Sequence, residues 1–214
     1  MALIHHTTLS PTKVELLAGW LPTRPWYHGP AAPELVKAGG FRLDDPAGEV
    51  GIEFMIVTAG TAGPEGPEAY LVPLTYRGAP LPGAEHALVG TMEHGVLGTR
   101  WAYDGCHDPV LTAGLLALIE GRAEAQAQSI TDTPDREVAR SYGGAGPVPG
   151  PGAPVDTDEA TEFAAPDGGP VLRLRRVLTA GSTAPEDAVG EVTGAWQKPD
   201  GTRARGLFAT LEKR

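Results

Sequence analysis

Histidine, cysteine and acidic side chains that could take part in chemistry gather in the middle of the sequence. His94 follows Glu93, and His107 lies between Cys106 and Asp108. Imidazole and carboxylate groups can bind zinc together, but a zinc site needs three or four ligands in tight geometry. The Glu93–His94 pair would have to meet His107 through a separate loop, and nothing in the spacing enforces that meeting. We therefore predict no metal site.

Cys106 beside His107 could in principle form a nucleophile and its base. A catalytic thiol needs a base within hydrogen-bond reach and usually a third group that orients the base. Neighbours in sequence rarely reach that geometry, so a buried or half-buried thiol in a turn is the favoured interpretation. His5 and His6 would point to opposite faces of a strand, which favours solvent-facing edge residues over a metal pair.

Arg100, Trp101, Tyr103, Asp104 and Asp108 form the densest polar and aromatic grouping. One interpretation makes this grouping the lip of a binding surface. The favoured alternative is structural, because Asp108 precedes a proline and suits a helix cap. Under that alternative we expect Arg100 to pair with Asp104 across the turn.

Trp26 and Tyr27 follow Trp20 and could form a platform on which a sugar stacks. Aromatic residues near a helix are more often core residues, and that interpretation leads here as well. We predict no catalytic residue. The predicted ligand or partner surface consists of Trp26, Tyr27, His94, Arg100, Asp104 and His107.

Familiar cofactor motifs are absent from the sequence. The glycines form neither a GxxxxGK[ST] loop nor a strand–GxGxxG–helix unit, and no Gly-x-Ser-x-Gly elbow occurs. We therefore expect no cofactor. The adjacent Asp44 and Asp45 lie in a turn with proline and glycine, where aspartate serves turn formation.

Composition excludes several classes of function. The formal net charge is −10, which repels nucleic-acid backbones, and no run of lysine or arginine offsets it. No apolar run reaches the roughly 20 residues that a membrane helix needs, and no secretory signal is visible. A single cysteine rules out an internal disulfide. A cytoplasmic location follows as an expectation.

The first 60 residues predict a short strand, a helix and two longer strands. Residues 2–9 suit an edge strand, and Ser10-Pro11 is typical of a helix start. Residues 35–43 and 50–58 read as strands around the turn DDPAGE. The second strand is apolar on both sides except at Glu53, so we expect it to be central and covered on both faces.

The next residues predict further antiparallel strands and one more helix. Residues 70–77 and 97–103 read as strands, with a short one near Val89 between them. Asp108-Pro109 predicts a helix with aspartate as cap, and Gly121 suits its end.

The last third of the chain begins with a glycine- and proline-rich region. Gly 29 and Pro 21 together make nearly a quarter of the 214 residues. Residues 143–154 read as a linker or long loop. Strands follow at 171–178, 189–196 and 204–211, with Lys-Pro-Asp-Gly at 198–201 as a hairpin signal between the last two.

Hairpin-length connections favour antiparallel pairing, so the predicted class is α+β with a curved antiparallel sheet packed on helices and extra C-terminal strands. The predicted organisation has a domain over 1–130, a Gly/Pro-rich linker or long loop over 131–170, and C-terminal strands over 171–214 that pack on the same domain.

Three stretches of residues resemble the N-terminal cap domain of actinobacterial maltokinases. They are LLAGWLPTRPWYHG; GGFRLDDPAGEVGIEF together with YLVPLTYRGAPL; and HALVGTMEHGVLGTRWAYDGCHDP with the helix after it. The resemblance covers roughly residues 1–122. It implies a cystatin-like sheet wrapped on a helix. Gly29 is followed by Pro30 where the kinases are expected to have lysine, so a contact made there can be lost.

The resemblance implies only part of a kinase. Full maltokinases have further lobes that bind ATP and maltose and yield maltose 1-phosphate. Phosphoryl transfer needs a phosphate-holding lysine, a catalytic aspartate and an acidic ligand of magnesium. This chain has no HGD-type catalytic loop and no Asp-Phe magnesium motif. It resembles a free-standing cap without the kinase.

Three hypotheses for function follow. The first is a non-catalytic binding or regulatory module tied to trehalose, maltose or glycogen metabolism, with a protein partner or self-association and with a sugar as a possible ligand. The second is an enzyme on α-glucans or maltose, or a kinase accessory subunit; a branching enzyme would need a large barrel, for which 214 residues are too few. The third is a cystatin-like protease inhibitor, although no QxVxG-like hairpin is evident. Nucleic-acid and membrane partners are not expected.

Overall fold

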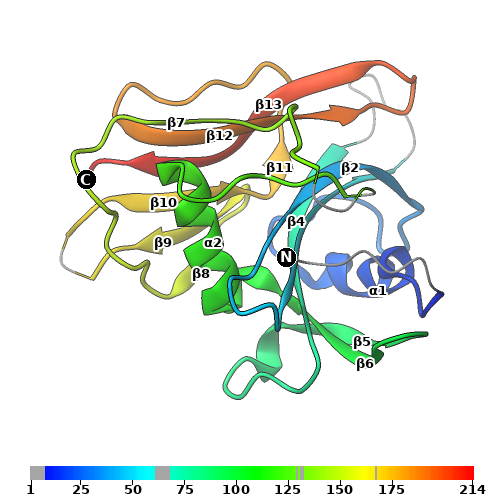
Figure 1. Cartoon of the computed structure of the whole chain (residues 1–214). Helices are drawn as coiled ribbons and strands as arrows, with labels where there is room; N and C mark the ends of the chain where they lie inside the picture. The colour runs from blue at the N-terminus through cyan, green and yellow to red at the C-terminus, as the bar shows by residue number, and fades with distance from the viewer. Residues whose placement is uncertain (1–7, 61–67, 129, 131–132, 167) are drawn as a thin grey trace.

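Two antiparallel sheets and two helices build the fold, shown in Figure 1 as a computed structural model that describes residues 8–60, 68–128, 130, 133–166 and 168–214. The helical elements are α1 (Lys13–Trp20), η1 (Leu21–Thr23), η2 (Glu85–Ala87), η3 (Gly105–His107) and α2 (Pro109–Glu120). The first sheet has the order β1-β5-β6-β4-β3-β2, with β11 added beside β4. Its strands are β1 (Leu9–Ser10), β2 (Leu35–Leu43), β3 (Gly51–Ala59), β4 (Glu68–Arg77), β5 (Leu88–His94), β6 (Gly98–Asp104) and β11 (Val177–Leu178).

The second sheet has the order β7-β12-β13-β10-β9-β8. Its strands are β7 (Ala139–Tyr142), β8 (Pro154–Asp156), β9 (Ala160–Ala164), β10 (Val171–Arg175), β12 (Ala188–Gln197) and β13 (Arg203–Glu212). The structure confirms the predicted α+β class, a curved antiparallel sheet packed on helices with extra C-terminal strands. Among the described residues, neither helix is long and apolar enough to cross a membrane.

The central strand β3 is buried on both faces, as its sequence predicts. Ile52, Phe54 and Ile56 point into one apolar cluster together with α2 and the second sheet. Met55 and Val57 point into another cluster, which contains α1, η1 and the aromatic residues after them. Alternate side chains of a strand lie on opposite faces, so a strand apolar at nearly every position must be covered twice.

The second sheet covers the face of the first sheet that α1 leaves free. In Figure 1 its strands run from the yellow-green β7 through yellow to the red β13, with α2 lying beside them. Leu172, Leu174 and Phe208 of this sheet share one cluster with α2 and with Phe41 and Phe54. The chain passes from the second sheet to the first at Arg176, between β10 and β11. Residues 171–178, expected to form one strand, therefore divide between two sheets.

The start of α1 differs from the prediction. The cap is Thr12, not Ser10, and the helix begins at Lys13. The Glu15 amide donates to Thr12 Oγ1 at 3.3 Å, while Glu15 Oε2 accepts the Thr12 amide at 2.7 Å. This reciprocal capping box outweighs the Ser-Pro signal two residues earlier. Of the edge strand predicted over 2–9, residues 2–7 lie outside the described residues, and Leu9 pairs with β5.

Three strands lie in the region 131–170, for which the sequence predicted a linker or loop. β7 pairs with β12, and β8 with β9, while residues 143–153 contain no strand. These strands are short and mostly lie at sheet edges, where proline and glycine are tolerated, so local composition hides them. The hairpin predicted at 198–201 is confirmed: it joins β12 to β13, and the Lys198 amide donates to Thr202 O at 2.8 Å.

Candidate functional site

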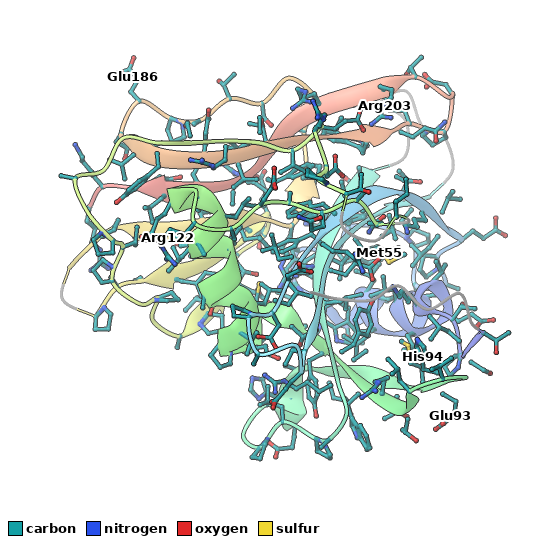
Figure 2. The ribbon with its side chains drawn as sticks, viewed as in Figure 1. Met55, Glu93, His94, Arg122, Glu186 and Arg203 are labelled. Carbon is teal, nitrogen blue, oxygen red and sulfur yellow. The ribbon has the colours of Figure 1, made fainter. Side chains whose placement is uncertain are left out.

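Four of the six predicted site residues lie on or next to the β5–β6 hairpin, but they are spread along its length. His94 pairs with Gly98 at the outer end, and Asp104 ends β6 at the inner end. A strand of seven residues is about 20 Å long, so His94 and His107 cannot share a ligand. Figure 2 shows Glu93 and His94 at the outer end, at the lower right. Within the residues described, no group of three or more His, Cys, Asp or Glu side chains could hold a metal ion.

Asp104 is a partner of Arg176, and the predicted Arg100–Asp104 pair is wrong. Arg176 Nη2 donates to both carboxylate oxygens of Asp104, at 2.8 and 2.6 Å. Both side chains are buried, at 0% and 1% exposure. Arg100 lies in mid-strand opposite Met92, away from the turn. The sequence could not reveal this ion pair because 72 residues separate its members.

The guanidinium of Arg176 makes further contacts besides those with Asp104. Its Nε donates to Thr161 Oγ1 at 2.7 Å, and its Cζ lies 4.7 Å from the centroid of the Trp26 ring. The Arg176 carbonyl accepts the Leu71 amide at 2.9 Å. One side chain thus joins β9 of the second sheet, β6 of the first sheet and the aromatic segment after α1.

Asp108 caps α2, as predicted, and also forms an ion pair. It accepts the Val110 amide at 3.0 Å, and Arg77 donates to its two oxygens, each at 2.7 Å. The Asp108 side chain is completely buried. These contacts hold the carboxylate in a structural role. The structural interpretation of the grouping around residues 100–108 therefore holds for Asp108.

His107 and His86 meet at the inner end of the hairpin. Nε2 of His86 lies 3.0 Å from Nδ1 of His107, with the two rings nearly perpendicular. Burial lowers the pKa of His107, and the nearby Asp104 carboxylate opposes that effect. This pair could not be predicted from the sequence, because it joins two 3-10 turns that the fold places side by side.

A cavity of about 430 Å³ opens next to the two imidazoles. Its walls include Pro109 and Thr112 of α2, Phe163 of β9 and the segment 151–154. Cys106 also lines it, but the thiol is buried, and burial raises the pKa of Cys106. A protonated thiol is a poor nucleophile. The predicted structural role of Cys106, as a buried thiol in a turn, is confirmed.

The outer end of the hairpin presents two aliphatic side chains to solvent. Val96 is 60% exposed and Leu97 is 45% exposed. The turn beneath them is tied down: His94 Nδ1 accepts the amides of Val96 and Leu97 at 3.3 and 3.1 Å, and the Gly95 amide donates to Thr8 O at 3.2 Å. We call residues 94–98 the hairpin tip. The sequence signal for this tip is an apolar pair between two glycines. The strand expected over residues 97–103 hides this signal, because it counts Leu97 as a strand residue.

Trp26 and Tyr27 lie in the core. Trp26 is fully buried, and its ring centroid lies 5.9 Å from that of Trp20 and 6.2 Å from that of Tyr70. The Tyr27 ring lies 5.0 Å from Tyr70, and its hydroxyl donates to Pro30 O at 3.1 Å. Neither ring faces solvent in the way that stacking on a sugar requires.

A further buried carboxylate, Glu53, holds α1 to the first sheet. Lys13 forms an ion pair with it, Tyr76 donates its hydroxyl at 2.7 Å, and Gln128 Nε2 donates at 2.9 Å. Burial would raise the pKa of Glu53, but Lys13, the hydrogen bond from Tyr76 and the charge of Lys37 outweigh burial and lower it. The sequence showed Glu53 only as an interruption of an apolar strand.

Comparison with known families supports the resemblance that the sequence suggested. Residues 20–108 match the family model of the maltokinase N-terminal cap domain. The match runs from the end of α1 to the residue that caps α2. It spans less than half of the 214 residues and leaves the second sheet outside. No curated protein matches the chain. The segment that carries β2 to β6 is therefore similar to that cap domain, and we call it the cap-like module.

Proposed function

We propose that this chain is a non-catalytic binding module, in which a maltokinase-type cap docks on a partner protein through the hairpin tip. The observation that carries the proposal is the exposure of Val96 and Leu97 on a turn that is held by hydrogen bonds to His94 and Thr8. A turn normally carries glycine, asparagine, aspartate or proline, so two exposed aliphatic side chains there need an explanation. Preorganised apolar side chains bind with a smaller entropic cost than mobile ones.

The ion pairs of the buried carboxylates support a role of the chain in binding over a role in catalysis. Asp104, Asp108 and Glu53 each hold a cation, and each joins separate parts of the fold. A general acid or base needs its carboxyl group within reach of a substrate proton. These three groups instead stabilise the sheets that carry the hairpin.

The family match suggests where such a module would work. Maltokinase acts on maltose, so we place the partner among the enzymes of trehalose, maltose and glycogen metabolism, with a maltokinase-like kinase as one option. The phosphotransfer hypothesis has a simple test. The purified chain with ATP, magnesium and maltose should form no maltose 1-phosphate, and robust formation would overturn the proposal.

Docking through the tip is tested by substitution. In co-purification with candidate enzymes of that metabolism, the Val96→Asp/Leu97→Asp variant should lose the partner that the unmodified chain retains, because central apolar contacts carry most of the binding energy. The matched control is Val36→Asp/Val155→Asp, since those valines are 63% and 62% exposed and lie on other strands. Equal retention by both variants would contradict docking through the tip.

A protease inhibitor is a second candidate, favoured by one observation. The hairpin tip lies beside the N-terminal strand, as the Gly95–Thr8 hydrogen bond shows, and inhibitors of the cystatin fold use a hairpin and an N-terminal arm. The tip reads HGVLG, which shares Val96 and Gly98 with the QxVxG pattern but has His94 in place of glutamine. Inhibition of a papain-type protease that is lost in the Val96→Asp/Leu97→Asp variant would favour this candidate.

A further inference from the structure

Another cavity, of about 400 Å³, lies where β2 approaches the β12–β13 hairpin. Phe41 of the first sheet and Phe208 of the second lie at its base, with ring planes within 5° and centroids 6.1 Å apart. Figure 2 shows Arg203, one of its lining residues, on the β12–β13 hairpin at the top of the molecule. The volume is in the range of small-molecule sites.

Two consecutive glycines shape one wall of this cavity. Gly39 and Gly40 have φ values of +149° and +128°, at a bulge of β2. A Cβ atom on Gly40 would lie 2.1 Å from Phe54 O and 2.6 Å from Gln128 Nε2. Only glycine lets the Gln128 side chain lie across the strand at this point.

The polar lining of the cavity balances its charges. Two cationic side chains face two anionic ones, and two amides complete the set. These residues are Lys37, Arg203, Asp135, Glu137, Gln128 and Gln197. A strongly charged ligand would gain no net attraction here, and an apolar ligand would cover polar groups without giving them partners.

Several of these groups have capacity left for a ligand. Within the described part of the chain, the side chains of Lys37 and Gln197 make no hydrogen bond or ion pair, although the charge of Glu53 acts on Lys37 and opposes the lowering of its pKa by burial. Gln128 donates Nε2 to Glu53, which fixes the amide and leaves its oxygen as an acceptor. Arg203 pairs with Glu137 at the rim, where both are half exposed. The cavity therefore offers donors and acceptors together.

We propose that this cavity binds a neutral polyhydroxylated molecule of about one or two sugar rings in size. Hydroxyl groups both donate and accept hydrogen bonds, so one ligand type satisfies the ammonium, the carboxylates and the amides at once. This site is separate from the hairpin tip, and the inference does not depend on the proposed docking.

The test is calorimetric titration of the full chain with maltose, trehalose and glucose, and with inorganic phosphate and glucosamine as charged probes. We expect saturable binding of at least one neutral sugar and no tighter binding of either charged probe. The inference is wrong if none of the three sugars binds, or if phosphate or glucosamine binds more tightly than all of them.

Variants locate the binding. Lys37→Met and Gln197→Leu remove exposed groups without internal partners, so the fold should persist, and each should weaken sugar binding about tenfold. Lys213→Met is the matched control for the lost charge and should leave affinity unchanged. Sugar binding that survives both lining variants would place the ligand elsewhere and overturn the inference. The Val96→Asp/Leu97→Asp variant should bind sugar normally, which separates a failure here from a failure of the docking proposal.

Discussion

The two faces of the first sheet are closed in different ways. The face that carries Met55 and Val57 is covered by α1, η1 and the aromatic residues just after them. The face that carries Phe54 and Ile56 is covered by α2 and by strands from more than a hundred residues later in the chain. A sheet face with many apolar side chains must be covered. Here the chain supplies both covers itself.

The two covers limit which surfaces of the cap-like module a partner can reach. Both faces of the first sheet are covered within the chain, so self-association would have to use another surface. Val96 and Leu97 of the hairpin tip stay exposed and are the apolar side chains through which we propose that a partner docks. Light scattering of the Val96→Asp/Leu97→Asp variant would show whether self-association uses the tip.

Removing the second cover should have the largest effect. A chain ending at Gln128 keeps the whole first sheet except β11 but exposes Phe41, Phe54 and the apolar side of α2. We expect this truncated chain to lose fixed tertiary structure, seen as a loss of the near-ultraviolet circular dichroism and a gain of dye-binding apolar surface. A cooperative unfolding transition with native stability would show that the cap folds alone.

Breaking the link between the sheets should have the next largest effect. Arg176→Met leaves the Asp104 carboxylate buried without its cation, which should reduce the free energy of unfolding by about 3–5 kcal/mol. Urea titration measures the loss. Arg175→Met is the control, since Arg175 pairs with the exposed Glu159. Adding Asp104→Asn to Arg176→Met should recover part of the loss, and no recovery would argue against the ion pair as its cause.

A smaller effect is expected for a change in α1, which helps to cover the other face of the first sheet. Thr12→Ala removes the acceptor for the Glu15 amide at the start of α1 and should cost about 1 kcal/mol. Thr183→Ala, on an exposed loop, serves as the control and should change stability by only a few tenths of a kcal/mol. A Thr12→Ala variant as stable as the control would mean that α1 is held by packing alone.

The smallest effect should come from pH at the His86–His107 pair. Burial lowers the pKa of His107 below its ordinary value of 6.5, so below that pH the unfolded chain binds more protons than the folded chain. Stability should therefore fall as the pH drops through about 6.5.

Comparing Tm at about pH 7.5 and 5.5 isolates this contribution. The His107→Asn variant should show a smaller drop in Tm than the unmodified chain. His28→Asn, which replaces an exposed histidine, should not. If the drop is the same with and without His107, another group carries the pH dependence.

Local signals predicted much of the fold. The strand over 35–43 is confirmed at both ends, since the turn DDPAGE marks its end. The α2 helix follows Asp108-Pro109 and ends before Gly121, because capping is a local property. The turn role of Asp45 is confirmed as well, as it accepts the amides of Ala47, Glu49 and Val50.

Contacts between distant residues could not be predicted in this way. Nothing near Arg176 in the sequence names Asp104, and nothing near His107 names His86, because the fold brings them together. Edge strands such as β8 are set by their neighbours, and their proline content argues against them locally. Of the residues predicted to form a surface, His94 lies at the hairpin tip, whereas Trp26 and Tyr27 lie in the core.

We infer that both covers of the first sheet belong to one cooperative unit that holds the hairpin tip in place. The most direct test follows Trp26, in the cluster beside α1, and Trp196, in the cluster with the second sheet. Fluorine NMR of fluorotryptophan-labelled protein reports each ring separately during one urea titration. Coincident midpoints for the two resonances are the predicted result. Loss of the Trp196 signal at a clearly lower urea concentration than that of Trp26 would contradict the claim.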